Sequence, residues 1–228
     1  AQMVAGHSYA LALGDAPLQV NSAQCLGWTD ADALKARWGD DYERFHALLV
    51  QAAQTVGNSV LTHDGSPAAA CYHSISAGHT EASQNVWETA LPYLQGVPSP
   101  ADLAADGYET TVEYSPEQVS AALTSLELEP GNDPAAWFGD AVRDDAGYIT
   151  AQTVCGTAVS GTKMRRAFHL RSASFSVEYN GTSFCFTTHG YGHGVGLSQY
   201  GAKALAEQGR TWQEILLYYF PGCEVRHS

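Results

Sequence analysis

Residues 187–202, with the sequence TTHGYGHGVGLSQYGA, are the stretch around which the rest of this chain is organised, and we call them the signature loop. Its glycines stand among polar residues: Gly190, Gly192, Gly194, Gly196 and Gly201 lie between His189, Tyr191, His193, Ser198, Gln199 and Tyr200. Glycine adopts conformations that other residues avoid and lets a ligand come close. The polar groups hydrogen-bond without a fixed charge, which suits a neutral, hydroxyl-rich ligand. A tight strand-to-helix turn is the alternative, and composition leaves both interpretations open.

Length, charge and cysteine content bound the class of protein. A chain of 228 residues is long enough for one large domain or two small ones. The formal net charge of −13 argues against nucleic acid and against an anionic membrane surface, because both attract basic residues. No apolar run is long enough to span a bilayer, and no signal peptide is visible. The cysteines lack CxxC spacing, which excludes a zinc-ribbon or redox motif.

The N-terminal part is predicted to be mostly helical. A first helix covers residues 1–13, and an edge strand is expected at 18–28. A capping box of Thr29 and Asp32 begins a short helix that ends at Gly39. A longer helix follows, in which apolar residues recur at three- and four-residue steps: Tyr42, Phe45, Leu49, Ala52 and Val56. We expect this stripe and its aromatic rings to be buried in the core.

Strand and turn signals begin after that helix. Residues 59–63 and 68–74 are predicted to form a hairpin around the turn at 64–67. A strand at 108–114 precedes a helix that a capping box of Ser115 and Gln118 begins. Residues 127–133 contain Pro130 and Gly131 and are the best linker candidate.

The C-terminal half is predicted to be rich in strands. Strands are expected at 148–154, 162–168, 175–179 and 183–188, and Asn180-Gly181 is a hairpin signal. A helix is expected at 197–208, beginning within the signature loop. A capping box of Thr211 and Glu214 begins the last helix, which stops at Pro221. Strict strand–helix alternation is absent, so we predict an α+β fold with mixed, mostly antiparallel strands and hairpins and with helices in both halves.

Two clusters of side chains in the sequence could bind a metal ion or a substrate. Cys71, His73 and His79 lie close in sequence, but no fourth ligand is spaced to match them, so we predict no metal and no other cofactor. A basic cluster lies in the C-terminal half, and it is either a solvated strand face or a contact to substrate carboxylates or hydroxyls: Lys163, Arg165, Arg166 and Arg171. Both interpretations of the basic cluster stay open.

The chain also resembles the stage II sporulation protein D (SpoIID/LytB) family. The resemblance is carried by GYGHGVGLSQYGAKALAEQGRTWQEILLYYFPGCEV at 190–225 and by four segments in the family's order. These are AQMVAGHSYAL at 1–11, LTHDGSPAAACYHSISAGHTEASQNVW at 61–87, PYLQGVPSPAD at 92–102 and GTKMRRAFHLRSASF at 161–175. The match covers most of the chain, and its Gly/His signature is long and specific.

The resemblance implies a peptidoglycan lytic transglycosylase that cleaves glycan strands to anhydromuramic acid products during engulfment in sporulation. One acid is enough for this reaction, because the sugar's own C6 hydroxyl attacks the anomeric carbon, whereas glycosidases use a second carboxylate. The family's catalytic glutamate lies upstream of the segment that begins at Ala1 and is absent from these residues, so the catalytic residue is unknown here. Glu81 matches a loop residue of the family rather than the acid. We therefore expect this chain alone to bind glycan weakly and not to cleave it.

The resemblance further implies a cleft with two walls. One wall is at His73, Ser76, Gly78 and Thr80, and the other is at Gly190, Tyr191, His193, Gly194, Ser198, Gln199 and Tyr200. A Ser/His hydrolase is a weaker alternative, because Ser198 lacks the strand-turn-helix GxSxG context. Some family members carry a His/Cys zinc cluster around the position of Cys25, and the neighbours of that cysteine here, Ala23 and Gln24, indicate that the cluster is lost.

The resemblance also sets expectations for the whole protein. It implies a single SpoIID-like domain over residues 1–228, divisible into lobes at 1–127 and 133–228. Glycan strands are the expected ligand, an amidase and other engulfment proteins are the expected partners, and nucleic acid is not. The expected location is outside the cytoplasm at the cell wall, with an N-terminal membrane anchor that precedes Ala1. The alternative from a different class is a non-catalytic glycan-binding module that enhances a cell-wall amidase.

Overall fold

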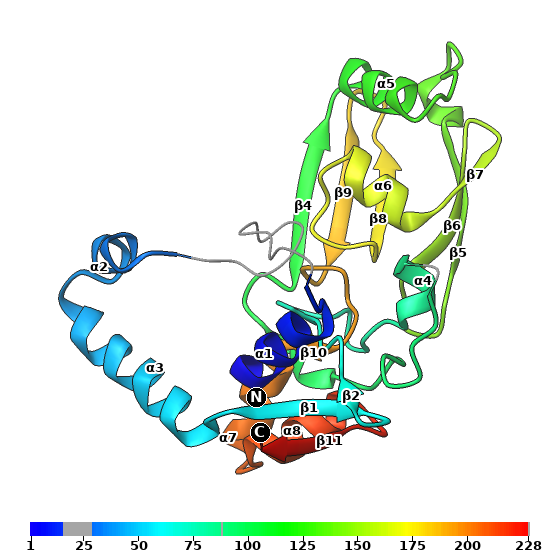
Figure 1. The fold of residues 1–228 in the computed structure, drawn as a ribbon. Helices are drawn as coiled ribbons and strands as arrows, with labels where there is room; N and C mark the ends of the chain where they lie inside the picture. Colours follow the sequence, from blue (N-terminus) through cyan, green and yellow to red (C-terminus); the bar gives the residue numbers. More distant parts are fainter. Residues whose placement is uncertain (16–28, 88, 228) are drawn as a thin grey trace. The chain divides into compact units, whose positions relative to one another are not determined.

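The computed structural model describes residues 1–15, 29–87 and 89–227 (Figure 1). The chain divides into two compact units. Unit 1 consists of Ala1–Cys71 and Gly222–Ser228, and unit 2 consists of Tyr72–Pro221. Both units combine helices with antiparallel sheets, which confirms the predicted α+β class. Residues 127–133, the predicted linker, lie inside unit 2.

A three-stranded antiparallel sheet forms the centre of unit 1. Its order is β11-β1-β2, with β1 at Ser59–His63, β2 at Ser66–Pro67 and β11 at Glu224–His227. Helix α1 (Gln2–Ala12) confirms the helix predicted at residues 1–13. It packs against β1 and β2. The buried Ser8 hydroxyl accepts a hydrogen bond from Leu61 N at 2.7 Å, so a polar side chain ties the helix to the sheet.

The predicted hairpin of unit 1 is shorter than expected. Asp64 and Gly65 take positive φ angles of 48° and 79° and turn the chain directly from β1 into β2. The predicted strand at 68–74 is wrong, because β2 ends at Pro67 and residues 68–71 form tight turns in which Ala70 N donates to Ala68 O. The following strand, β3 (Tyr72–His73), belongs to unit 2 and pairs there.

The helices between α1 and β1 pack mainly on one another. They are α2 (Ala31–Trp38), the 3-10 turn η1 (Gly39–Asp41) and α3 (Tyr42–Val56). The first cap is Asp30 rather than Thr29, since Asp30 Oδ1 accepts from Ala33 N at 2.7 Å. Gly57 ends α3 as predicted, with φ 52°. The edge strand expected at 18–28, together with Cys25, lies outside the described residues.

The apolar stripe of α3 is not buried, which corrects the sequence-based expectation. No residue of α3 is buried, and the Leu49 side chain is 43% exposed. The stripe's aromatic end packs locally, with the Trp38 and Phe45 rings 5.5 Å apart. Helical periodicity is correct here, but none of the described residues of unit 1 packs closely enough on α3 to bury its apolar face.

Two three-stranded antiparallel sheets build unit 2, in the orders β4-β9-β8 and β5-β6-β7. The first contains β4 (Glu109–Tyr114), β8 (Phe175–Tyr179) and β9 (Phe184–His189). The second contains β5 (Phe138–Arg143), β6 (Ile149–Val154) and β7 (Thr157–Val159). The Asn180-Gly181 pair turns β8 into β9 as predicted, with Tyr179 opposite Phe184.

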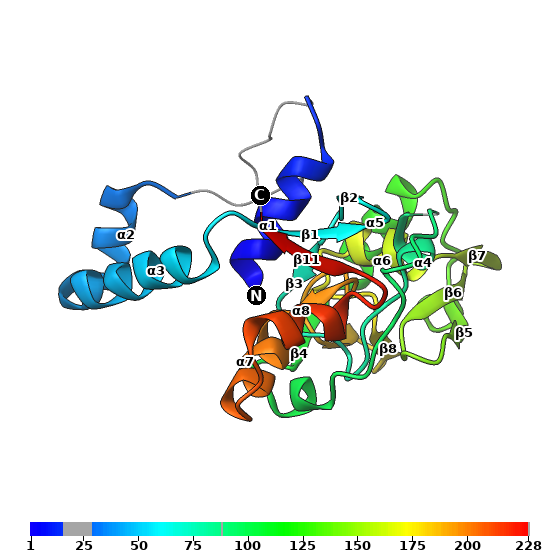
Figure 2. The ribbon, with the colours of Figure 1, turned by 60° about the horizontal axis from the view of Figure 1, so that its bottom comes forward.

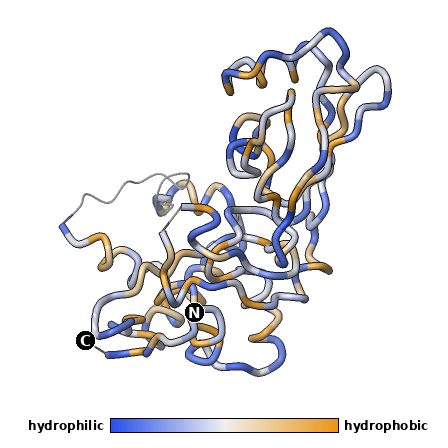
Figure 3. The backbone as a smooth tube through the Cα atoms, turned by 90° about the vertical axis from the view of Figure 1, so that its right-hand side faces the viewer, coloured by the Kyte–Doolittle hydropathy of each residue, from blue (hydrophilic) through white to orange (hydrophobic). Residues whose placement is uncertain are grey.

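Both sheets contribute to one apolar core together with α5 (Pro116–Ser125) and α6 (Gly161–Ala167). The core residues are Val119, Leu123, Trp137, Ile149, Val154, Val159, Met164, Phe168, Leu170, Phe175, Phe184 and Phe186. The stacked rings of Phe168 and Phe186 lie 4.8 Å apart. Hydrophobic and hydrophilic residues are interspersed along the backbone (Figure 3), and burial alternates along β9, in keeping with a sheet that buries one face.

Helix α6 replaces a predicted strand at 162–168. Ser160 caps it by accepting from Lys163 N at 3.3 Å. Met164 and Phe168 are four residues apart and both buried, which is a helical spacing rather than the alternation of a strand. The strand predicted at 162–168 is therefore wrong.

The remaining elements of unit 2 flank the signature loop. They are α4 (Ser83–Trp87), η2 (Pro100–Ala104), η3 (Pro134–Ala136), β10 (Leu197–Ser198), α7 (Gln199–Glu207) and α8 (Trp212–Tyr219). The capping boxes predicted at Ser115 and Thr211 are both present. Helices α7 and α8 lie side by side (Figure 2). None of the helices in the described ranges is long and apolar enough to cross a membrane.

Candidate functional site

The structure brings the signature loop against residues 72–81 of the same unit. Strand β3 pairs in parallel with β10, so that Tyr72 lies opposite Leu197. Beyond these strands, Glu81 N donates a hydrogen bond to Gly194 O at 2.8 Å. The two segments that the sequence analysis assigned to opposite walls therefore form one continuous wall, which we call the signature wall.

Close packing explains why glycine is needed in this wall. Gly192 has φ 123°, and a Cβ atom there would lie 2.6 Å from His73 Cβ. Gly194 has φ 82°, and a Cβ atom there would lie 2.6 Å from the Tyr148 hydroxyl oxygen. A side chain at either position would be strained and would collide with its neighbour. These glycines let the loop lie directly against the segment that carries His73.

A buried carboxylate holds the signature wall together. Asp102, in η2, is fully buried and accepts hydrogen bonds from Ser76 N at 2.9 Å and from Ser76 Oγ at 2.5 Å. Its other oxygen accepts from Ser198 Oγ at 2.9 Å. Ser198 in turn caps α7 by accepting from Gly201 N at 3.2 Å. Sequence reasoning missed Asp102, because nothing in its local pattern shows that it joins three distant segments.

Several predicted wall residues therefore have internal hydrogen-bond partners. The Ser76, Thr80 and Ser198 side chains are at most 1% exposed. Thr80 Oγ1 accepts from Val97 N at 2.8 Å and thus holds its own loop. Tyr191 and Tyr200 remain accessible at 48% and 39%, Gly78 and Gln199 are half-buried, and Gly190 is buried. The contribution of these residues to glycan binding stays a prediction.

Two neutral histidines lie in the signature wall. His73 Nδ1 lies 3.1 Å from Val195 O, and its buried Nε2 has no hydrogen-bond partner among the described residues. Burial lowers the pKa of His73 to about 4. Burial, with a smaller contribution from His73, lowers the pKa of His193 to about 3. Both pKa values lie far below neutrality, so both imidazoles are uncharged near pH 7.

An aromatic ring extends this wall to the surface. The Trp87 ring lies 5.0 Å from the His193 ring, and the tryptophan is 42% exposed. His193 Nδ1 accepts from Val195 N at 3.1 Å, which fixes the orientation of the imidazole. A half-exposed indole on a fixed support offers a flat apolar face with a polar edge, which suits a sugar ring. The sequence analysis did not select Trp87, although it ends the matched segment at 61–87.

A pocket of about 220 Å³ opens beside His193. Its polar lining residues are Glu81, Asn85, Asp144, Tyr148, Thr150, Thr162 and His193, and its apolar ones are Val86, Ile149 and Ala173. This volume is below the roughly 300–1,000 Å³ of pockets that enclose whole drug-sized ligands. The pocket can therefore hold one small group of a larger molecule.

The pocket contains a pair of carboxyl groups. Glu81 is 4% exposed, and its Oε1 accepts from Ala82 N at 2.6 Å and from Asn85 Nδ2 at 2.9 Å. Burial, followed by the neighbouring Asp144 carboxyl group, raises the pKa of Glu81 to about 8.

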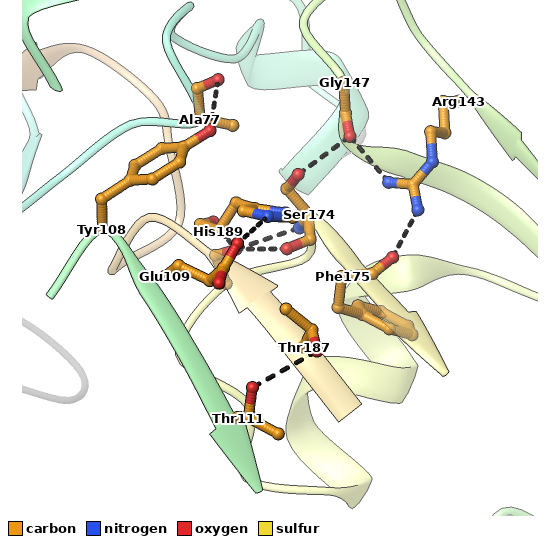
Figure 4. A network of polar contacts seen from close by, with 11 residues as sticks. Ala77, Tyr108, Glu109, Thr111, Arg143, Gly147, Ser174, Phe175, Thr187 and His189 are labelled. Atoms are coloured by element: carbon orange, nitrogen blue, oxygen red, sulfur yellow. Dashed lines mark hydrogen bonds and ion pairs between the residues drawn. The ribbon is translucent and has the colours of Figure 1, made fainter. Parts of the chain in front are cut away.

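The turn at residues 143–148 fixes Asp144. Its Oδ1 accepts from Ala146 N and from Tyr148 N, both at 3.0 Å, while Oδ2 is buried and receives no hydrogen bond from a donor in the described ranges. Figure 4 shows how Gly147 O in this turn accepts from Arg143 Nη1 at 2.9 Å and from Ser174 Oγ at 3.0 Å. The turn therefore holds the Asp144 side chain in a fixed position at the pocket.

The predicted basic cluster does not form one face. Lys163, Arg165 and Arg166 lie on α6, a helix rather than a strand. The Arg171 guanidinium instead lies over the Tyr191 ring at 4.2 Å. Burial lowers the pKa of Arg165. Arg171 therefore has a structural contact to the signature loop, and its contact to a substrate stays a prediction.

The geometry excludes the serine-hydrolase alternative. It also shows whether the possible metal ligands within the described residues lie together. Ser198 Oγ bonds Asp102 and Ser74 O, which leaves its hydroxyl without a histidine base. No three His, Cys, Asp or Glu side chains within 1–15, 29–87 and 89–227 gather to hold a metal ion. Cys25 lies outside these ranges, so the absence of zinc stays a prediction.

Comparison with known proteins identifies relatives of this chain. It is 33% identical over 196 residues to stage II sporulation protein D of Bacillus subtilis (strain 168), across 86% of this chain and 56% of that relative. The protein of the same name from Bacillus amyloliquefaciens is 33% identical over 204 residues, with the same coverage. The amidase enhancer of B. subtilis is 25% identical over 230 residues, across 75% of this chain and 32% of that protein.

The matches cover most of this chain but only part of each relative. No protein-family model matches the chain. The chain spans about half the length of the stage II sporulation proteins D that it matches, and the alignment takes in most of its own residues. Through the region that it shares with these relatives, the chain belongs to the stage II sporulation protein D family.

Proposed function

We propose that this chain carries the glycan-binding cleft of a sporulation cell-wall protein and that the whole protein is a peptidoglycan lytic transglycosylase. The observation that carries the proposal is the pocket lined by Glu81 and His193, with the half-exposed Trp87 ring 5.0 Å from the His193 ring. Neutral donors and acceptors next to an exposed aromatic ring suit an uncharged sugar chain. The names of the relatives support a role in sporulation and at the cell wall. We place the protein outside the cytoplasm, where peptidoglycan lies.

Digestion of purified glycan strands tests this proposal. Residues 1–228 and the protein extended upstream through the family's glutamate are each incubated with glycan, and the products are separated by chromatography. We expect anhydromuramic acid ends from the extended protein and none from residues 1–228, because removal of a general acid costs about 10²–10⁴-fold in rate. An alanine at the upstream glutamate is the control. Anhydro products from residues 1–228 would move the acid into this chain.

The second candidate is a non-catalytic module that enhances a cell-wall amidase. The 25% identical relative named an amidase enhancer favours it. Its test is the release of stem peptides from whole peptidoglycan by an amidase with and without this protein. Faster release, without anhydro ends from the extended protein, would support this candidate over the transglycosylase.

A further inference from the structure

We propose that Glu81 is a positioning residue, whose side chain holds helix α4 against the signature loop and so keeps the Trp87 ring beside the His193 ring. The inference rests on the proposed function only for the use of the Trp87 ring, which then faces a sugar of the glycan. Its structural part stands on hydrogen bonds and a ring contact within unit 2. It gives a role to Glu81, which the sequence analysis matched only to a loop residue.

The backbone of Glu81 is fixed to the signature loop. Its N–H donates to Gly194 O at 2.8 Å, and an isolated parallel bridge joins Glu81 to Val195. Val195 N in turn donates to His193 Nδ1 at 3.1 Å. One short stretch of loop therefore sets both the place of Glu81 and the orientation of the His193 imidazole.

The side chain of Glu81 holds the first turn of α4. Glu81 is 4% exposed, and its Oε1 accepts from Ala82 N at 2.6 Å and from Asn85 Nδ2 at 2.9 Å. Helix α4 has only five residues, and a helix of that length is not stable without tertiary contacts. Ser83 ties the start of the helix to residues 89–91, whereas Glu81 reaches Asn85, one turn further along. The position of α4 therefore depends on the Glu81 side chain.

Trp87 lies at the far end of α4, two residues after Asn85. Its ring centroid is 5.0 Å from that of His193, with the ring planes inclined by 55°, and Trp87 is 42% exposed. The hydrogen bond from Asn85 to Glu81 opposes a rotation of α4 that would lift the indole from the imidazole. An indole held in this way offers its exposed face to a ligand without the entropy cost of ordering a free side chain.

The indole N–H resonance of Trp87 tests the positioning role without any ligand. A ¹H–¹⁵N NMR spectrum of the full chain shows one indole signal for each of its 5 tryptophans, and Trp87→Phe assigns the signal of Trp87. Glu81→Ala removes the acceptor, so we expect the Trp87 signal to move toward that of a free indole and its quenching by acrylamide to increase. Glu81→Gln keeps a carbonyl oxygen for the same donors, so its Trp87 signal should stay at the wild-type position.

A change at Ser99 separates positioning from general destabilisation. Ser99 is also buried, and its hydroxyl group bonds the Tyr219 hydroxyl on α8 at 2.8 Å rather than a group on α4. We expect Ser99→Ala to lower the melting temperature and to leave the Trp87 signal unmoved. An unmoved signal in Glu81→Ala, an equal shift in Ser99→Ala, or a Glu81→Gln signal like that of Glu81→Ala would each overturn the inference.

A second variant keeps the test valid if Glu81→Ala does not fold. Asn85 is exposed, and Asn85→Ala removes the same side-chain hydrogen bond from the other partner. Its Trp87 signal should move in the same direction, by less than in Glu81→Ala because Ala82 N keeps its acceptor. Circular dichroism melting verifies that each variant is folded. A wild-type Trp87 signal in Asn85→Ala would overturn the inference.

Calorimetry with chitotetraose, a soluble uncharged glycan, tests the use of the ring. We expect Trp87→Ala and Glu81→Ala each to weaken its binding by about threefold to tenfold, and Glu81→Gln to bind it like the wild type. Wild-type affinity in Trp87→Ala would overturn the use of this ring by a sugar. Failure of the wild type to bind chitotetraose would overturn the glycan-binding step of the proposed function, and the NMR comparison would still decide the role of Glu81.

Discussion

The signature wall and helix α3 differ from each other in a way that their compositions do not suggest. The wall is rich in serine, threonine, histidine and glycine, yet Ser76, Thr80 and Ser198 are buried. Helix α3 carries an apolar stripe at helical spacing, yet none of its residues is buried. Burial therefore follows available partners more closely than polarity. Each of these buried hydroxyl groups has a hydrogen-bond partner, whereas no neighbour in the described part of the chain buries the α3 stripe.

The strongest test of the comparison removes the buried carboxylate of the wall. Asp102→Ala leaves Ser76 and Ser198 without their acceptor, so we expect the free energy of unfolding to fall by about 3–5 kcal/mol, as for other broken buried charged networks. Urea denaturation followed by tryptophan fluorescence measures it. Asp106→Ala, at an exposed aspartate four residues later, is the matched control and should change stability by less than about 0.5 kcal/mol. Equal effects of the two changes would show that the wall is not organised by Asp102.

A glycine pair tests the close packing of the wall. Gly192→Ala should cost about 1–3 kcal/mol, because the new methyl group adds a collision with His73 to the backbone strain of positive φ. Gly181→Ala has the strain alone, since φ is 96° there and nothing lies within 4 Å of the added atom. The difference between the two melting temperatures isolates the collision. If Gly181→Ala is the more destabilising change, the wall is not as tightly packed as we describe.

Acidification tests the buried histidines. The folded-state pKa values of His73 and His193, about 4 and about 3, lie below the usual 6.5. Their stabilising contribution is complete above pH 6.5 and is lost as pH falls toward pH 3–4, because the unfolded chain takes up protons first. We expect the wild type to lose more stability than His193→Asn between pH 6.5 and pH 5, by about 1 kcal/mol or about 2–4 °C in melting temperature. Parallel melting curves for the two proteins would contradict the neutral state of His193.

The smallest effect is expected in α3. Leu49 is 43% exposed, so Leu49→Gln should change the free energy of unfolding by less than about 0.5 kcal/mol. Phe186→Ala in the unit 2 core is the contrasting change, for which we expect about 3–5 kcal/mol, since Phe186 is fully buried. Chemical denaturation of both variants gives the comparison. A loss above about 2 kcal/mol for Leu49→Gln would mean that the stripe has a partner that burial in this chain does not show.

Local signals in the sequence predict a large part of the fold. The capping boxes at Ser115 and Thr211 and the Asn180-Gly181 turn specify structure within a few residues, and all three are present. The strand predicted at 162–168 is a helix, and its signal is the four-residue spacing of the buried Met164 and Phe168. That error shows that periodicity in a short segment does not separate a strand from a helix.

The candidate site was less predictable than the fold. The family resemblance indicated which two segments would form the site. It did not indicate Asp102, Asp144 or Trp87, whose roles come from contacts with residues far away in the chain. Conversely, Ser76 and Thr80 attracted attention as polar loop residues, and their side chains are used inside the protein. A single sequence carries no local signal that separates these two uses.

The parallel pairing of β3 with β10 has a consequence for folding order. Most of the residues of unit 2 separate Tyr72 from Leu197 in the sequence, and each of the two strands is just two residues long. Contacts of such long sequence separation have a high loop-closure entropy and form late. During synthesis, a chain that has emerged only as far as residue 190 contains His73 and Glu81 but no strand for β3 to pair with. We therefore expect the glycine-rich loop to complete the wall after the local hairpin at Asn180-Gly181 has formed.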